Sequence, residues 1–420
     1  MASELPLGWR RSTVADGLET IIDYRGKTPP KSADGIPLIS AANVKHGRID
    51  LTKASYISPE TYESWTTRGF TRPGDVLITT EAPAGEVAPY PTTGTFQISR
   101  RVMALRADGT TLQSGFLAYA LQSRPVQAAL LARNRGTTVP RVLKPDITGL
   151  ELLLPPLEEQ CRIAAVLGAL DDKIELNRKM NRTLEELAQA IFKSWFIDFD
   201  GVAESELVES ELGPIPKGWE VASVADIVQF NPRTKLAKGT VAKFVEMKVV
   251  PTDGPSIRNF STRAMKHGGS KFVQGDTLMA RITPCLENGK TALVDFLDAG
   301  EVAFGSTEFI VMRPKGAVQR EWIYCLARSE AFRNHAVANM TGSSGRQRVS
   351  VESLSFFRMA RPAAEQLDAF TATTRPLFER VTANAKESQT LANLRDTLLP
   401  KLISGEIRVP EAEKAVEAAT

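Results

Sequence analysis

Cationic, hydroxyl and amide side chains gather in three pairs of Gly- and Pro-rich stretches along this 420-residue chain. The richest pair is 133–141 and 339–348, in which arginines alternate with Gly, Ser and Thr. Loops of this kind bind phosphate through backbone amides, hydroxyls and cations, and their planar side chains can contact base edges. A solvent-exposed loop without a ligand has a similar composition, so that alternative stays open for each stretch.

The candidate contact residues fall into two similar sets, one in each half of the chain. In the first half they are Arg25, Lys27, Lys31, Asn43, Lys45, Arg133, Arg135, Thr137, Thr138 and Arg141. In the second half they are Arg233, Lys235, Lys238, Arg263, Lys266, Arg281, Ser343, Ser344, Arg346, Gln347 and Arg348. Further candidates are Thr79, Thr80, Arg100, Arg101 and Thr283.

No group of residues has the types and spacing that catalysis requires. Gly289-Lys290-Thr291 ends like a phosphate-binding loop, but Pro284 stands where the first glycine of that loop is needed. Asn231-Pro232-Arg233 begins like an adenine-methyltransferase motif and lacks its second proline and aromatic residue. The three cysteines have no metal-ligand spacing, and we interpret them as buried or incidental thiols. We therefore expect no catalytic centre and no metal site.

The candidate loops recur because the chain repeats itself after a little more than 200 residues. Gly8-Trp9 recurs as Gly218-Trp219, and Gly136-Thr137-Thr138 recurs as Gly342-Ser343-Ser344. Solenoid repeats have periods of about 20–50 residues, so this longer period indicates a duplicated domain instead.

Two long helical patterns follow the two repeated halves. Apolar residues recur at spacings of four and three from Ile163 to Trp195, and again from Phe370 to Leu402. This spacing is typical of a coiled coil, and two such helices in one chain can bury their apolar faces against each other. Polar residues interrupt both series at corresponding places: Asn177, Asn181, Asn384 and Ser388. We expect an antiparallel pair in which these four residues set the register; packing of each helix on its own domain is the alternative.

The expected fold class is α+β, with two similar mixed α/β domains separated by the two long helices and related as a pseudo-two-fold internal repeat. The expected ranges are domains 1–155 and 213–361, helices 156–196 and 362–405, a linker 197–212 and a frayed tail 406–420.

Charge is divided between these parts. The net charge is +4 for residues 1–155 and +8 for 213–361, but −7 for 156–212 and −2 for 362–420. Basic domains favour a polyanionic partner, and acidic helices favour a protein partner. The chain has no run of about 18 apolar residues and no apolar signal core, so we expect a cytoplasmic protein without a membrane partner.

In this order of domains and helices, the chain resembles the specificity subunits of type I restriction-modification enzymes over residues 5–409. The motifs that carry the resemblance are Leu7-Gly8-Trp9, Pro216-Lys217-Gly218-Trp219, Leu154-Pro155-Pro156-Leu157-Glu158-Glu159-Gln160 and Leu399-Pro400-Lys401-Leu402-Ile403-Ser404-Gly405-Glu406-Ile407. The start of the second helix, Arg361-Pro362-Ala363-Ala364-Glu365-Gln366, departs from the pattern by lacking one proline and the leucine.

The resemblance implies a non-catalytic subunit that recognises a bipartite sequence in double-stranded DNA. Each domain would be a target-recognition domain for one half-site, with the helix pair as spacer. Two methyltransferase subunits would dock on the helices and modify an adenine in each half-site, and two motor-nuclease subunits would join for restriction. The S-adenosylmethionine, ATP and magnesium would then belong to the partners. The alternatives are a coiled-coil scaffold that binds proteins without DNA readout, and an enzyme that acts on nucleic acid.

Overall fold

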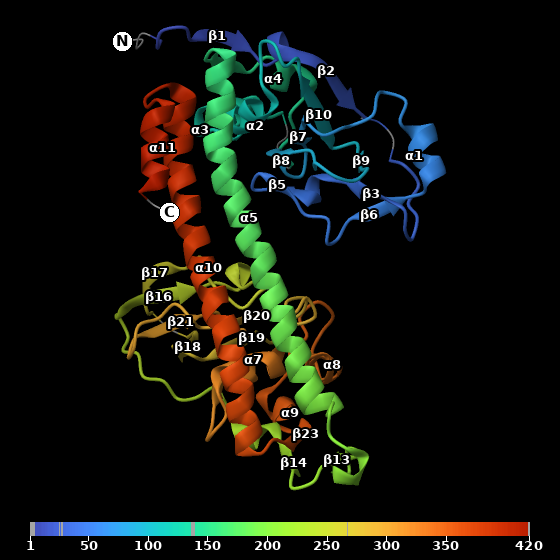
Figure 1. The fold of residues 1–420 in the computed structure, drawn as a ribbon, viewed down its shortest axis with the longest axis vertical. Coiled ribbons are helices and arrows are strands. Elements are labelled where there is room, and N and C mark those ends of the chain that lie inside the picture. Colours follow the sequence, from blue (N-terminus) through green and yellow to red (C-terminus); the bar gives the residue numbers. More distant parts are fainter. Residues whose placement is uncertain (1–4, 25, 27, 136–138, 267, 419–420) are drawn as a thin grey trace. The chain divides into compact units, whose positions relative to one another are not determined.

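The computed structural model describes residues 5–24, 26, 28–135, 139–266 and 268–418. The chain forms two compact units, Met1–Lys173 with Thr390–Thr420, and Ile174–Gln389. Each unit contains one mixed domain and a segment of each of two long helices, α5 (Leu157–Lys193) and α10 (Ala364–Ser404) (Figure 1).

The first unit is built on a four-stranded antiparallel sheet with the order β2-β10-β7-β8. After Asp75, the central strand β7 is a run of β-branched and apolar residues, and the strand is buried throughout, because α2 packs against it and its neighbour β8. A second sheet has the order β6-β3-β9, and β1 pairs with β11 just before α5. The strands are β1 (Arg10–Thr13), β2 (Leu18–Asp23), β3 (Ile36–Ile39), β4 (Val44–Lys45), β5 (Arg48–Ile49), β6 (Ser55–Ile57), β7 (Asp75–Thr80), β8 (Ala84–Pro89), β9 (Gln97–Ile98), β10 (Val102–Ala107) and β11 (Glu151–Leu154). The shorter helices are α1 (Pro59–Trp65), α2 (Ser114–Gln122), α3 (Arg124–Ala132), α4 (Lys144–Thr148) and α11 (Val409–Glu417).

The second unit repeats this plan. Its antiparallel sheet has the order β15-β22-β19-β20, and β14 pairs with β23 as β1 pairs with β11. Its other sheet, β17-β16-β21-β18, has one strand more than its counterpart. The strands are β12 (Leu207–Val208), β13 (Ile215–Pro216), β14 (Glu220–Ser223), β15 (Val228–Phe230), β16 (Val241–Val245), β17 (Ser261–Ala264), β18 (Ser270–Val273), β19 (Thr277–Ala280), β20 (Thr291–Leu293), β21 (Val302–Gly305), β22 (Phe309–Pro314) and β23 (Arg358–Arg361). The shorter helices are α6 (Val224–Ile227), α7 (Arg320–Arg328), α8 (Glu330–Ala338) and α9 (Val351–Ser355). The predicted α+β class and two-domain repeat are confirmed.

The same buried ion pair stabilises the main sheet in both units. Asp75 accepts hydrogen bonds from Nε and Nη2 of Arg106 at 2.7 and 2.9 Å, and Asp276 accepts them from Arg313 at 2.6 and 2.7 Å. Both carboxylates are 1% exposed, so removing either arginine would leave an uncompensated buried charge. Both halves contain a Gly-Asp turn here, Gly74-Asp75 and Gly275-Asp276, and its aspartate is therefore structural.

Within each unit, the segment of α5 packs against the segment of α10. In the second unit, Asn384 Nδ2 donates to Asn181 Oδ1 at 2.9 Å, and Asn177 Nδ2 donates to Ser388 Oγ at 3.3 Å. Higher numbers on one helix meet lower numbers on the other, so the segments are antiparallel, as predicted. The four polar residues of the helical pattern thus lie together, and their control of the register remains a prediction.

Three of the motifs that carry the sequence resemblance meet in the first unit. The indole of Trp9 donates to Glu159 Oε2 at 3.2 Å, and Arg408 donates to the same oxygen at 3.0 Å. Gly405 has a φ of 76°, and a Cβ atom there would lie 2.6 Å from Pro6 and 3.4 Å from Trp9. Only glycine fits this position. The first Gly-Trp motif, the start of α5 and the end of α10 therefore form one packed corner.

The frayed tail that we expected for 406–420 is wrong for most of that range, because Val409–Glu417 forms α11. Its Ala- and Glu-rich sequence is amphipathic, and Val409 and Ala412 are buried. Glu413 also forms an ion pair with Arg162 of α5 at 3.1 Å.

The expected linker 197–212 is also partly structured. The helical path of α5 continues through a wider turn over Ser194–Asp198, and β12 pairs with β13. Phe196 is buried in the core of the second unit, where its ring lies 6.1 Å from that of Trp219.

Candidate nucleic-acid interface

In the first domain, the residues just before α4 lie beside the end of β7 and the residues before β10. The Thr80 N–H at the end of β7 donates to Arg101 O at 2.9 Å, and the Val142 N–H donates to Thr80 O at 3.0 Å. Three chain segments that are distant in sequence are therefore held side by side: the end of β7, the residues before β10 and the loop before α4.

These segments bring one carboxylate and two arginines together. Arg101 Nη2 lies 3.1 Å from Glu81 Oε1, and Arg141 Nε lies 4.0 Å from Glu81 Oε2. The side chains of Glu81, Arg101 and Arg141 are 27%, 40% and 54% exposed, so both guanidinium groups reach solvent. We call these three residues the first arginine cluster.

In the second domain, the loop 339–348 has the same backbone connections. The Arg281 N–H after β19 donates to Glu308 O at 3.0 Å, and the Val349 N–H donates to Arg281 O at 3.0 Å. Within the loop, Thr341 and Arg348 exchange two backbone hydrogen bonds of 3.0 and 2.8 Å.

Here too a carboxylate holds an arginine beside a second one. Arg348 Nη2 and Nε donate to Glu308 at 2.8 and 2.9 Å, and Arg348 Nη1 donates to Arg346 O at 3.1 Å. Arg281 contributes a further positive charge that acts on Glu308, and its Nε atom is buried without a hydrogen-bond partner among the described residues. We call Arg281, Glu308 and Arg348 the second arginine cluster.

The two clusters occupy equivalent positions with a different order of charges. The backbone hydrogen bonds match three pairs of positions: Thr80 with Arg281, Arg101 with Glu308, and Arg141 with Arg348. In each domain two arginines surround one glutamate, so each cluster has a net charge of +1.

The ion pair in the second cluster stabilises the charged forms of both partners. Hydrogen bonds from Arg348 lower the pKa of Glu308 below its ordinary value, and nearby positive charge adds to the effect. The hydrogen bonds with Glu308 in turn raise the pKa of Arg348. Both groups are therefore ionised at neutral pH, and the guanidinium keeps a fixed orientation.

Several other candidates lie on the surface. The exposed ones are Lys31, Lys45, Arg233, Lys235, Lys238, Lys266, Ser343, Ser344 and Arg346. Gln347 is half-buried, and its carbonyl accepts from the Thr283 N–H at 3.0 Å. Arg25, Lys27, Thr137 and Thr138 lie outside the described residues.

Asn43 is not a surface contact, and its selection from the sequence was wrong. It is 5% exposed, and its Oδ1 accepts from the Ser40 N–H at 2.9 Å. Its Nδ2 donates to Asp50 O at 2.8 Å. An asparagine in a basic, polar loop has the composition of a ligand contact, but here it caps a short helical turn over Ala41–Asn43.

Three of the predicted arginines are engaged within the protein. Arg133 donates to the carbonyls of Asp146 and Gly149 at 2.8 and 3.1 Å, so its guanidinium ties the loop to α4. Arg135 lies 3.0 Å from Asp146 Oδ1 and is 61% exposed. Arg263 lies over the ring of Phe244 at 4.4 Å and forms an ion pair with Glu246.

Glu81 and Glu308 are the residues that sequence reasoning missed. We sought cations, hydroxyls and amides, and a carboxylate in a basic domain does not fit a polyanionic ligand. The sequence contained one signal: in a basic half of the chain, Glu81 directly follows a β-branched run and Glu308 directly precedes one.

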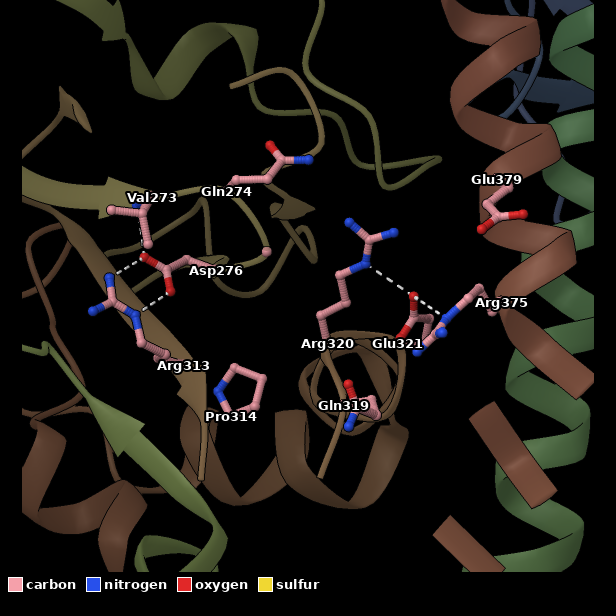
Figure 2. A pocket seen from close by; sticks show the side chains of 11 residues that line it. Val273, Gln274, Asp276, Arg313, Pro314, Gln319, Arg320, Glu321, Arg375 and Glu379 are labelled. Carbon is pink, nitrogen blue, oxygen red and sulfur yellow. Dashed lines mark hydrogen bonds and ion pairs between the residues drawn. The ribbon is translucent and has the colours of Figure 1, made fainter. Parts of the chain in front are cut away.

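The second unit also contains a charged hollow of about 430 Å³ between the start of α7 and α10 (Figure 2). Figure 2 shows Arg320 and Arg375 directed at Glu321, with nitrogen-to-oxygen distances of 2.9 and 4.0 Å. The side chain of Glu321 is 1% exposed, and its Oε2 atom has no hydrogen-bond partner among the described residues. No serine, cysteine, lysine or histidine is among the described residues that line the hollow, and its buried carboxylates, Asp276 and Glu321, are paired with arginines.

Neither a metal cluster nor a membrane span is found in the described part of the chain. No three His, Cys, Asp or Glu side chains there lie close enough to hold a metal ion. None of the described helices combines the length and the apolar character needed to cross a bilayer. Of the three cysteines, Cys325 is buried, Cys285 is half-buried and Cys161 is exposed.

Comparison with known proteins finds similarity to one family. Residues 24–186 match the family described as "Type I restriction modification DNA specificity domain". The MjaIX type I restriction enzyme specificity subunit of Methanocaldococcus jannaschii is 29% identical over 354 residues, which cover 80% of this chain and 78% of that protein. The HindI specificity subunit of Haemophilus influenzae is 24% identical, with 74% and 81% covered.

A solved structure has the same fold over nearly the whole chain. The type I restriction-modification S subunit from M. genitalium aligns with a TM-score of 0.55 and 15% identity, covering 96% of this chain and 98% of that one. Over residues 24–186 the chain therefore matches a type I restriction modification DNA specificity domain, and over most of its length it is similar to type I restriction enzyme specificity subunits.

Proposed function

We propose that this chain recognises a bipartite sequence in double-stranded DNA, with each domain contacting one half-site. The observation that carries the proposal is the pair of arginine clusters at equivalent positions of two repeated basic domains. Exposed lysines and arginines around the clusters would neutralise phosphates and provide salt-dependent affinity. Side chains of the loops 133–141 and 339–348 would then discriminate between base pairs.

The helix pair would serve as the spacer between half-sites. α5 has 37 residues and α10 has 41, which correspond to about 55 and 60 Å at 1.5 Å per residue. Half-sites on one face of DNA lie about 34–36 Å apart per helical turn. Once the width of the domains is counted, helices of this length suit two half-sites separated by about one turn.

We further propose that the chain has no catalytic activity of its own and that its partners supply the chemistry. Two methyltransferase subunits would dock on the helix pair and each methylate an adenine, which must leave the base stack to react. Two motor-nuclease subunits would join them for restriction. The S-adenosylmethionine would bind to the methyltransferase, and the ATP and magnesium to the motor subunits.

The test is to map adenine methylation across the genome of a host that carries the chain with its methyltransferase. We expect modified adenines in a two-part motif with a constant gap, and loss of that motif when the gene for this chain is deleted. Methylation that persists unchanged after deletion would contradict the proposal.

The second candidate function is a coiled-coil scaffold whose basic domains bind protein. It is favoured only by the acidic, paired helices. A scaffold would bind its partners equally well in the presence and absence of DNA, and its DNA affinity would not depend on sequence. Competition between oligonucleotides with and without the mapped motif separates the two candidates.

A further inference from the structure

We propose that the two arginine clusters are the specificity-determining contacts, and that each recognises a guanine through a guanidinium held by a glutamate. Arg101 and Arg141 would contact the base in the first half-site, with Glu81 as the positioning residue. Arg281 and Arg348 would do so in the second half-site, with Glu308 as the positioning residue. This inference rests on the proposed DNA-binding function and specifies which bases it reads.

The hydrogen bonds of Arg348 leave the required donor edge available. Its Nε atom and one proton of Nη2 face Glu308, and one proton of Nη1 bonds to Arg346 O, so one proton on Nη1 and one on Nη2 remain for a ligand. A planar edge with two parallel donors matches the O6 and N7 acceptors of guanine, which is the commonest specific contact in the major groove.

The carboxylate also reduces the entropy cost of binding. A long, mobile arginine loses rotamer freedom when it contacts a base, and one that is already held loses less. Immobilising such a side chain costs about 0.5–1.5 kcal/mol, which corresponds to a 2- to 12-fold effect on affinity. Glu308 holds Arg348 with two hydrogen bonds below 3.0 Å, so the bound orientation exists before DNA arrives.

Charge distinguishes these arginines from phosphate contacts. A phosphate contact depends on net positive charge. Each such contact contributes about one unit to the slope of the logarithm of affinity against the logarithm of salt concentration. In each cluster the negative charge of the glutamate cancels the positive charge of one arginine. This weakens a phosphate contact but leaves the geometry for base readout intact. Exposed lysines of the two domains, such as Lys31 and Lys235, form no ion pair within the described structure and suit phosphates better.

The equivalence of the two clusters gives the inference its first test. Both half-sites of the wild-type methylation motif should contain at least one G·C pair. A motif in which either half-site consists only of A·T pairs would overturn the proposal for that domain.

The second test uses variants in the second domain, produced as the full chain together with the methyltransferase. Arg348→Lys keeps the charge but loses the planar edge, and we expect 10- to 100-fold weaker preference for guanine at one position. Glu308→Gln keeps an acceptor but loses the ion pair with Arg348. We expect the preference for guanine at the same position to fall less, by about 2- to 12-fold. The first half-site should be unchanged in both variants.

Glu301→Gln is the matched control. Glu301 also forms an ion pair in the same domain, with Lys243 Nζ at 2.9 Å, and its side chain is 30% exposed, compared with 24% for Glu308. It lies outside the cluster, so the methylation motif should remain as in the wild type.

A purely structural role for the cluster gives a different result. Methylation would then fall by the same factor at all sites, with no base position relaxed, and that outcome in Arg348→Lys would overturn the inference. Should Glu308→Gln abolish methylation altogether, Arg348→Lys still decides the question, because it preserves the ion pair. A wild-type chain that produces no bipartite motif refutes the proposed function itself, whereas an intact motif in both variants refutes only this inference.

Discussion

Glu185 is the residue whose replacement most directly tests how the second domain is attached to α5. Its side chain is 6% exposed, and its Oε1 atom accepts a hydrogen bond of 2.5 Å from the hydroxyl of the fully buried Tyr324 on α7. Arg328 Nε lies 3.1 Å from the same oxygen. Burial, together with the adjacent Glu185 charge, raises the pKa of Tyr324 well above its ordinary value, so the phenol remains a donor.

Glu185→Ala removes the acceptor and leaves a buried hydroxyl and a buried guanidinium behind. Breaking a buried ion pair by removing one partner costs about 3–5 kcal/mol. Arg328 Nη1 still donates to the carbonyls of Gly289 and Thr252 at 2.8 and 3.1 Å, so the cost falls near the lower limit, about 3 kcal/mol. Glu185→Gln retains an acceptor for Tyr324 and should cost about 1 kcal/mol, the value of an ordinary hydrogen bond.

Hydrogen exchange read by mass spectrometry measures this loss where it occurs, since the chain forms two units that need not unfold together. A loss of about 3 kcal/mol should accelerate exchange in α7 roughly 100-fold, with β7 of the first unit as the internal reference. Glu186→Ala is the matched control, because the neighbouring Glu186 is exposed and should change stability by less than about 0.5 kcal/mol. Equal effects of Glu185→Ala and Glu186→Ala would refute the reasoning.

Three further predictions concern the helix pair and the first domain. Asn384→Leu removes the hydrogen bond to Asn181 and should destabilise the second unit by about 1–2 kcal/mol in urea denaturation. The double variant, Asn181→Leu with Asn384→Leu, should recover most of this loss of stability. A double variant that is less stable than Asn384→Leu would contradict this account. Backbone N–H groups of Leu112, Thr111 and Thr110 outweigh the effect of burial and lower the pKa of Asp108 from 3.8 to about 2, so its stabilisation is complete above the unfolded value and is lost as pH falls through about 2. Asp108→Asn should therefore lower the melting temperature at pH 7 but not at pH 2, and an equal decrease at both values would argue against the effect. Inserting seven residues into each long helix adds about 10 Å, so the gap in the methylation motif should widen by about three base pairs while both half-sites stay the same; an unchanged gap would exclude the spacer role.

The sequence alone was sufficient to predict the helix pair, the domain repeat and the family. These features depend on local periodicity and on motifs that a single pass along the chain reveals. The four-three spacing from Ile163 to Trp195 requires a helix with one apolar face, and a second copy of it supplies a partner. The spacing also predicted that the polar residues of the two helices would face each other, and the structure adds that Asn384 bonds to Asn181.

Burial of individual polar residues was beyond the reach of the sequence. Asn43 and Lys45 belong to the same polar loop, yet one is buried and saturated by internal hydrogen bonds and the other is exposed. The difference depends on which way the backbone turns at Ala41–Asn43. In the same way, the composition of 406–420 did not show that Val409 and Ala412 would find apolar neighbours and form a helix.

The arginine clusters were decided by tertiary structure alone. Glu81, Arg101 and Arg141 are separated by up to 60 positions in the sequence and meet only because β7, β10 and the loop before α4 pair in one register. A shift of one residue in that register would turn each side chain to the opposite face of the sheet. Ion pairs across strands depend on non-local pairing, whereas a helical stripe depends on neighbours within a few turns, and this is why the helices were predictable and the clusters were not.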